Sequence, residues 1–198
     1  MMTTTDSRQR FLASAARLLQ QRGYHGTAIS DVLADSGAPR GSLYFLFPGG
    51  KEELAAAAIE LGASQICAAM RHLFETTAEL DKAIDAVVAM LCAQLESSGY
   101  SLGCPVAPVA LEDIDSARVQ GAVTTAYDTW QDVIAERLQR DGHRRSRARE
   151  LAVFALSAIE GALLLAKVRR DVAPLQRVAK ELAGVLRAPA PAAKAVKP

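Results

Sequence analysis

A chain of 198 residues can hold one large domain, or one small domain joined to a larger one. Half of the residues are hydrophobic but only 5% are aromatic, which favours packed helices over a sheet and predicts an all-α fold. The net charge of +1 hides a basic first quarter, because residues 1–51 carry six basic and three acidic side chains. This asymmetry indicates a polyanionic partner at one end of the protein.

Cysteine spacing and hydropathy exclude several classes of protein. Cys67, Cys92 and Cys104 are widely spaced and form no CxxC pair, which argues against a disulfide framework and a zinc site. The first ten residues have no apolar stretch typical of a signal peptide. The richest apolar run, residues 156–168, contains Glu160 and is too short to cross a bilayer. We therefore expect a cytoplasmic protein with no membrane anchor, metal or cofactor.

The N-terminal segment predicts two helices. Apolar residues recur at helical spacing from Phe11 to Leu19, so a first helix is expected from about residue 6 to Gly23. Thr27 has the side chain of a good N-cap, and a second helix is expected to begin there.

A turn around Gly37 then leads into a third helix over roughly residues 39–47. Gly37 suits the left-handed conformation that ends a helix, and Pro39 is tolerated in the next first turn because its missing N–H is not needed there. Two helices joined by a short turn with glycine form a helix-turn-helix, although ordinary helical hairpins also use this pattern.

The outward residues of the third helix have the chemistry of a DNA-contacting surface. Arg40 suits O6 and N7 of guanine, a contact worth about 1–3 kcal/mol of discrimination. Gly41 costs a helix about 1 kcal/mol relative to alanine, which is tolerable where a backbone must approach another surface closely. Leu43 and Phe47 are expected to pack inward. The predicted DNA-binding set is Thr27, Pro39, Arg40, Gly41, Ser42, Tyr44, Phe45 and Lys51.

Two kinds of contact are expected within this set. Arg40 and Ser42 are predicted to read bases, whereas Thr27, Tyr44 and Lys51 are predicted to hold phosphates. Lys51 follows the Pro-Gly-Gly break and would lie at the free amides of the fourth helix. Any one of these residues could equally be an incidental surface residue, but as a set with the turn they favour DNA recognition.

The rest of the chain is expected to hold six more helices, about nine in all. Five are predicted near residues 51–74, 80–96, 116–140, 148–170 and 174–187, and the tail 188–198 is predicted to be disordered. The short helix within 103–112 is implied by the resemblance of that segment to a known family. The helix at 148–170 is apolar over too wide an arc to be covered by one neighbour. Its sequence therefore favours an additional apolar partner surface.

Three residues and one loop of this region each allow two interpretations. Cys104 could be a redox-sensing or ligand-contacting thiol, but a small packing residue is favoured because no histidine or lysine lies near it in sequence. Tyr127 and Trp130, three residues apart, are expected in the core. The alternative is that both line a ligand pocket, because each brings a polar group to an apolar site. The basic loop at residues 143–147 is expected to be solvated rather than a second nucleic-acid patch.

The stretch from Gly23 to Leu54, GYHGTAISDVLADSGAPRGSLYFLFPGGKEEL, resembles the N-terminal DNA-binding domain of TetR-type transcriptional regulators. Its FPGGKEEL ending and the later GCPV…ALE segment at residues 103–112 are similar to the subgroup of the LmrA and YxaF regulators. Many members carry a histidine directly before the phenylalanine that corresponds to Phe47, where this chain has Leu46. Leu46 cannot donate a hydrogen bond to a phosphate or a base.

The resemblance implies a division of labour along the chain. Residues 1–50 would form the helix-turn-helix domain, and residues 51–187 a ligand-binding and dimerisation domain whose last two helices, about 148–187, pair with a second copy. The implied protein is a homodimeric repressor, released from a pseudo-palindromic double-stranded operator by a small apolar or aromatic effector. We expect the effector site to include Met70, Phe74, Leu91, Leu95, Cys104, Tyr127, Trp130 and Phe154.

Two alternatives come from other classes. A helical small-molecule enzyme would use Cys104 or Glu160, but the sequence has no Ser/His/Asp set, no metal spacing among its three histidines and no phosphate loop. A helical binding protein or scaffold with a degenerate head is the other. An enzyme is not expected.

Overall fold

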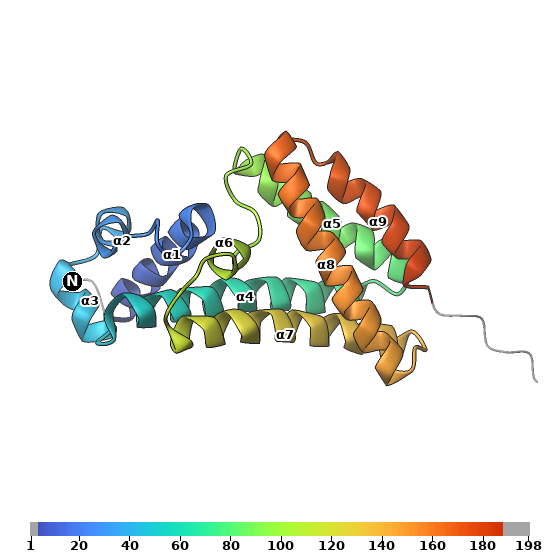
Figure 1. Ribbon diagram of the computed structural model, residues 1–198, viewed down its shortest axis with the longest axis horizontal. Helices are drawn as coiled ribbons and strands as arrows, with labels where there is room; N and C mark the ends of the chain where they lie inside the picture. The colour runs from blue at the N-terminus through green and yellow to red at the C-terminus, as the bar shows by residue number, and fades with distance from the viewer. Residues whose placement is uncertain (1–3, 188–198) are drawn as a thin grey trace, which may run out of the picture.

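The computed structural model describes residues 4–187, and this part of the chain contains nine α-helices and no strand (Figure 1). The helices are α1 (Thr4–Arg22), α2 (Ile29–Ser36), α3 (Arg40–Leu46), α4 (Gly50–Thr76), α5 (Leu80–Ser97), α6 (Ala107–Ala110), α7 (Ala117–Arg140), α8 (Arg145–Arg169) and α9 (Ala173–Val185). The prediction of an all-α fold with about nine helices is confirmed. The predicted disordered tail, 188–198, lies outside the described residues.

The head, as we name helices α1–α3, is built around the apolar face of α1. Phe11, Leu18 and Leu19 on α1 are all buried, as their spacing predicts. Leu43 and Phe47 are also fully buried, and the ring of Phe47 meets that of Phe11 edge-on with centroids 6.4 Å apart. Burial of these side chains fixes α3 with its opposite face turned to solvent.

The body, as we name helices α4–α9, is organised along two long helices. α4 and α7 lie side by side along the long axis of the molecule, and α1 packs on the end of α4 nearest the head (Figure 1). At the other end, α8 packs on α7, and α9 packs on both α5 and α8. α4 therefore runs from the end of α3 into the centre of the body.

The beginnings of two head helices differ from the prediction. Thr27 is not the N-cap of α2, because its buried hydroxyl donates to the Gly23 carbonyl at 2.7 Å and closes the turn after α1. Ala28 holds the N-cap position instead, and the Asp31 carboxylate accepts a hydrogen bond from its amide at 3.4 Å. Pro39 is the N-cap of α3 rather than part of its first turn.

The segment around α6 joins the head to the body. The Glu112 carboxylate accepts hydrogen bonds from the backbone amides of Tyr24 and His25, at 2.8 and 2.9 Å. Gln20 on α1 donates through its side-chain amide to the Gly103 carbonyl at 2.5 Å. These long-range bonds hold the C-terminal end of α1 against the body.

Two helices, α4 and α8, are long and apolar enough to cross a membrane by length and composition, with mean hydropathy of 1.2 and 2.0 in their most apolar stretches. The apolar run at residues 156–168 is too short to cross a bilayer, but the complete helix α8 has 25 residues. Core helices of globular proteins also pass this test, and both helices pack within the bundle. α8 nevertheless leaves several large apolar side chains exposed.

Candidate DNA-binding surface and effector cavity

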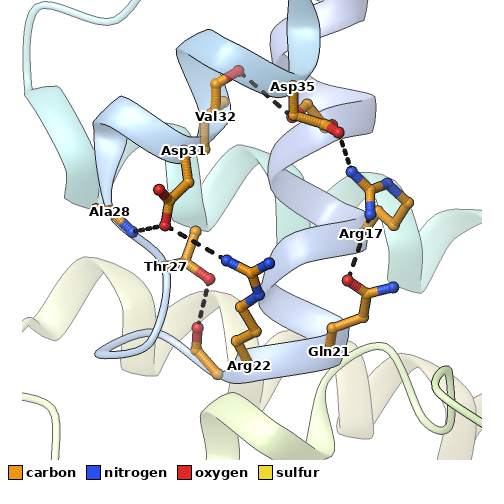
Figure 2. A network of polar contacts seen from close by, with 10 residues as sticks. Arg17, Gln21, Arg22, Thr27, Ala28, Asp31, Val32 and Asp35 are labelled. Atoms are coloured by element: carbon orange, nitrogen blue, oxygen red, sulfur yellow. Dashed lines mark hydrogen bonds and ion pairs between the residues drawn. The ribbon is translucent and has the colours of Figure 1, made fainter.

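A polar network holds α2 against α1 and so sets the position of the turn and of α3 (Figure 2). The Asp35 carboxylate accepts a hydrogen bond from the Ser14 hydroxyl at 2.6 Å and pairs with the Arg17 guanidinium. The hydrogen bond from Ser14, followed by that from Arg17, lowers the pKa of Asp35 below its ordinary value. A second pair, Arg22 with Asp31, lies one helical turn earlier on α2, with its closest charged atoms 3.5 Å apart.

The turn between α2 and α3 depends on Gly37. Its φ of +57° is left-handed, as predicted, and glycine adopts this conformation without the steric cost of a Cβ. Ala38 is buried beneath the turn, and Pro39 then leads into α3 with an extended backbone. The predicted helix-turn-helix geometry is present.

The outer face of α3 is exposed and has no packing partner in the described chain. Tyr44 and Phe45 expose 55% and 79% of their surface, unusual values for aromatic side chains. Arg40 and Gly41 are exposed at the start of the helix, and Ser42 is partly exposed. The five residues that form this α3 face are therefore together on one side, as the spacing predicts.

Gly41 has no structural requirement for glycine. A Cβ built at this position would meet no atom within 4 Å, and its backbone is helical. The glycine therefore lowers helix propensity without relieving any clash in the molecule. No contact within the described residues therefore accounts for the glycine at this position.

Three residues around the α3 face lie differently from the rest. The Thr27 hydroxyl is buried and already bonded to Gly23, so it is not presented to a phosphate in this structure. The Lys51 ammonium lies 4.2 Å from the centroid of the Tyr24 ring, and burial lowers its pKa, opposed by the charge of Glu112. Leu46 is partly buried and packs against the core.

The first free amide of the α4 segment also has an internal partner. The Gly49 amide donates to the Glu53 carboxylate at 2.7 Å, and the Arg118 guanidinium lies 3.7 Å from the same oxygen. A carboxylate from one turn along the helix thus satisfies one of the amides at the helix start where a phosphate was expected. The pattern Gly-x-x-x-Glu at a helix start is the signal that could have indicated this arrangement.

The body contains a partly open cavity of about 90 Å³ that is lined by residues of α4, α5, α7, α8, α9 and the loop before α6. Five of the eight predicted effector residues line it: Met70, Phe74, Leu91, Cys104 and Trp130. The lining is otherwise aliphatic: Ile66, Ile84, Val87, Val88, Met90, Pro105, Ile134, Ala155, Leu156, Ile159, Leu163, Leu182 and Leu186, with Glu160 as the exception.

The other three predicted effector residues do not line this cavity. Leu95 is buried in the core with 1% of its surface exposed. Phe154 is half-exposed because it lies on the outer face of α8, away from the bundle. Tyr127 lies beside the cavity, with its hydroxyl 4.0 Å from the Cys104 sulfur and its ring edge-on to Trp130.

The polar atoms at the cavity are few. The Trp130 indole N–H donates to the Ala63 carbonyl at 3.1 Å and is therefore already satisfied. The Cys104 sulfur accepts weak hydrogen bonds from the amides of Val106 and Ala107. Burial raises the pKa of Cys104 far above its ordinary value, which favours the protonated thiol. Burial also raises the pKa of Glu160.

Comparison with known families gives two matches that together cover most of the chain. Residues 11–58 match the model of the bacterial regulatory proteins of the tetR family. Residues 81–181 match the C-terminal domain of LmrA/YxaF-like transcriptional regulators. The residues between the two matches, 59–80, form the rest of α4 and lead into α5.

Similar proteins of the same length are transcriptional regulators. An uncharacterised HTH-type transcriptional regulator of Mycobacterium tuberculosis is 43% identical over 190 residues, which cover 93% of this chain and 96% of that protein. The HTH-type transcriptional regulator LmrA of Bacillus subtilis is 33% identical over 187 residues, 94% of this chain and 100% of LmrA. These relatives are regulators and not enzymes, in agreement with the sequence analysis.

Solved structures share the fold at lower sequence identity. The reduced form of NemR from E. coli superposes with a TM-score of 0.80 at 22% identity, over 93% of this chain and 100% of NemR. The regulator CifR, solved as a cysteine mutant with double-strand operator DNA, gives a TM-score of 0.73 at 24% identity, over 90% of this chain and 94% of CifR. The chain belongs to the TetR family of DNA-binding transcriptional regulators, in the group with an LmrA/YxaF-like C-terminal domain.

Proposed function

We propose that this regulator is a homodimeric repressor that places α3 in the major groove of a pseudo-palindromic operator. The exposed α3 face carries the proposal, because Arg40, Tyr44 and Phe45 have no packing role there. Arg40 would pair with guanine and Ser42 would contact a neighbouring base, while Phe45 suits a thymine methyl. Tyr44 would donate to a phosphate, and Gly41 lets the backbone approach the groove wall.

Thr27 and Lys51 would contribute to DNA binding less directly. The Thr27 hydroxyl supports the turn before α2, and its place on DNA would require its bond to Gly23 to break. Lys51 could reach a phosphate only by leaving the ring of Tyr24. We therefore assign their side chains a supporting role in the head, with residues 1–50 as the DNA-binding domain and α4 onward as the body.

A second copy would cover the exposed apolar surface of α8 and α9. We name this surface the α8/α9 face; its large apolar residues are Val153, Phe154, Leu164, Leu165, Val168 and Val185, each between 46% and 74% exposed. Ser157 and Gly161 are exposed between them, so the face forms a stripe with helical spacing along α8. Two copies related by a two-fold axis would pair these helices and bring two heads to successive major grooves, about 34 Å apart.

The body cavity would hold the effector, with an apolar or aromatic molecule as the ligand class. α4 contributes Met70 and Phe74 to the cavity wall and begins at Gly50, the last residue of the Pro-Gly-Gly break that follows α3. A shift of α4 on binding would therefore change the spacing between the two heads. Differential binding of about 1–3 kcal/mol between the two states would be enough to release the operator.

Selection of bound sequences from random double-stranded DNA tests this function. The expected result is a two-fold-symmetric site whose affinity falls steeply as salt concentration rises. The protein would act in the cytoplasm, where such a site is accessible. Recovery of no preferred sequence, or binding that is independent of salt, would contradict the proposal.

A further inference from the structure

The body cavity contains a single carboxyl group in otherwise apolar surroundings. Of its nineteen lining residues, Glu160 is the one with a carboxylate, and no lysine, arginine or histidine is among them. Glu160 comes from α8, is partly buried, and lies one turn before Leu164, at the edge of the α8/α9 face. A carboxylate is expensive to bury without a partner, so its place in the cavity wall requires an explanation.

The groups that face Glu160 do not neutralise it. The loop before α6 supplies the Cys104 thiol, and α7 supplies the Tyr127 hydroxyl, which lies 4.0 Å from the Cys104 sulfur. Burial raises the pKa of Glu160, and the hydrogen bond with Cys104 opposes this rise without any contribution from a basic side chain. Lys167, two turns further along α8, donates to the Ser101 carbonyl at 3.1 Å instead.

The aromatic walls of the cavity add to the preference for positive charge. Phe74 and Trp130 both line it, and the faces of aromatic rings attract ammonium groups. The Arg137 guanidinium lies 5.8 Å from the centroid of the Phe74 ring but outside the cavity lining. Arg137 is itself paired with Asp141 at 2.8 Å and bonded to the carbonyls that end α4, so it is not a partner for Glu160.

We propose that the effector of this regulator is a lipophilic cation, with an apolar or aromatic body in the cavity and an ammonium group against Glu160. The inference rests on the proposed function, because it names the class of molecule that the same cavity binds. A ligand ammonium would supply the countercharge that the protein lacks at this position. An anionic ligand would instead place two like charges in one apolar site. The cavity volume of about 90 Å³ suits a body no larger than one ring, because a cavity of about 150 Å³ is enough to hold benzene.

A matched set of single-ring probes tests the inference on the full-length protein. Calorimetric titration would compare benzylamine, which is protonated at neutral pH, with benzyl alcohol and benzoate. We expect the amine to bind about tenfold more tightly than the alcohol and the carboxylate to bind most weakly, since one unscreened ion pair at a partly buried site is worth about 1.4 kcal/mol or more.

Two variants test whether Glu160 is the group that binds the amine. Glu160→Gln keeps the shape of the side chain and should weaken binding of the amine about tenfold while changing that of the alcohol less than threefold. Glu150→Gln removes an exposed carboxylate from the same helix and should change neither. Thermal unfolding of each variant shows whether it is folded, and retained alcohol binding by Glu160→Gln shows that its cavity is intact.

The outcomes separate this inference from the proposed function. Equal or tighter binding of the alcohol, or an amine affinity unchanged by Glu160→Gln, would overturn the lipophilic cation. Absence of binding by all three probes would also overturn it. If the alcohol rather than the amine releases the protein from its selected operator, the repressor function stands and the cationic effector fails.

Discussion

The α3 face and the α8/α9 face are both exposed and rich in apolar groups, but they differ in composition and shape. The α3 face is short, and its two aromatic rings are interleaved with Arg40, Gly41 and Ser42. The α8/α9 face is a longer apolar stripe of one aromatic and five aliphatic side chains, with small residues between them. Hydrogen-bonding groups among aromatic rings suit base edges and phosphates, whereas a stripe without hydrogen-bonding groups suits another helix. Exposure of apolar residues alone would not have distinguished the two partners.

The largest expected effect comes from placing charge on the α8/α9 face. The double variant Leu164→Glu with Val168→Glu would bury carboxylates in the proposed interface, at several kcal/mol for each unpaired charge. We expect a monomer by sedimentation equilibrium and a loss of operator affinity of about 100-fold or more, because one head cannot hold both half-sites. Thr124→Glu, on an exposed position of α7, is the control. A double variant that remains dimeric would assign the face to some other partner.

Arg40→Ala tests the α3 face in isolation. Loss of a bidentate contact to guanine should weaken operator binding about 10-fold to 100-fold and relax specificity at one position of each half-site. Fluorescence anisotropy with the selected operator measures the affinity, and sedimentation should show an unchanged oligomer. Lys82→Ala removes an exposed cation from α5 and should have little effect. If Arg40→Ala and Lys82→Ala weakened operator binding equally, the loss would reflect the net charge of the protein and not a contact made by Arg40.

Glu160→Gln should change stability in a pH-dependent way. The pKa of Glu160 is raised above 4.5 in the folded protein, so between 4.5 and the raised value the folded state holds a proton that the unfolded state has lost. Wild-type stability contributed by this group therefore falls as pH rises through that window. The variant should be more stable than wild type at pH 8, by about 1.4 kcal/mol for each unit of elevation, and nearly equal to it at pH 4. Thermal melts at both values check this, and a constant difference would contradict it.

Gly41→Ala should give the smallest change in stability, with opposite signs for folding and binding. A methyl group at this position meets no neighbouring atom, so helix propensity should stabilise the head by up to about 1 kcal/mol. The same methyl group should weaken operator binding if the backbone approaches DNA closely. Gly37→Ala is the contrast, because its left-handed φ should make the substitution destabilising by about 1–2 kcal/mol. An unchanged operator affinity for Gly41→Ala would remove Gly41 from the contact surface.

The helices and the recognition turn were predictable because their causes are local. Periodic apolar residues and turn residues placed eight helices within a few residues of their observed bounds, and the family resemblance implied the short α6. Gly37 takes the left-handed conformation that its position in the turn requires. The exposed residues of α3 followed from the same periodicity once Leu43 and Phe47 were taken as its buried pair. Capping was less predictable, because the Thr27 hydroxyl can either accept a hydrogen bond from an amide in the first turn of α2 or donate one to the Gly23 carbonyl.

The sequence by itself determined the all-α fold, the helix-turn-helix and the chemistry of the α3 face, since each depends on residues close together in the chain. Only the tertiary structure decided which side chains of the body share the cavity. Leu95 and Phe154 were misplaced because the rotation of α5 and α8 about their axes is fixed by packing among several helices at once. The same packing placed Glu160 in the wall of an apolar cavity. It also placed Lys51 against the ring of Tyr24, whose backbone amide is bonded to Glu112 of the body.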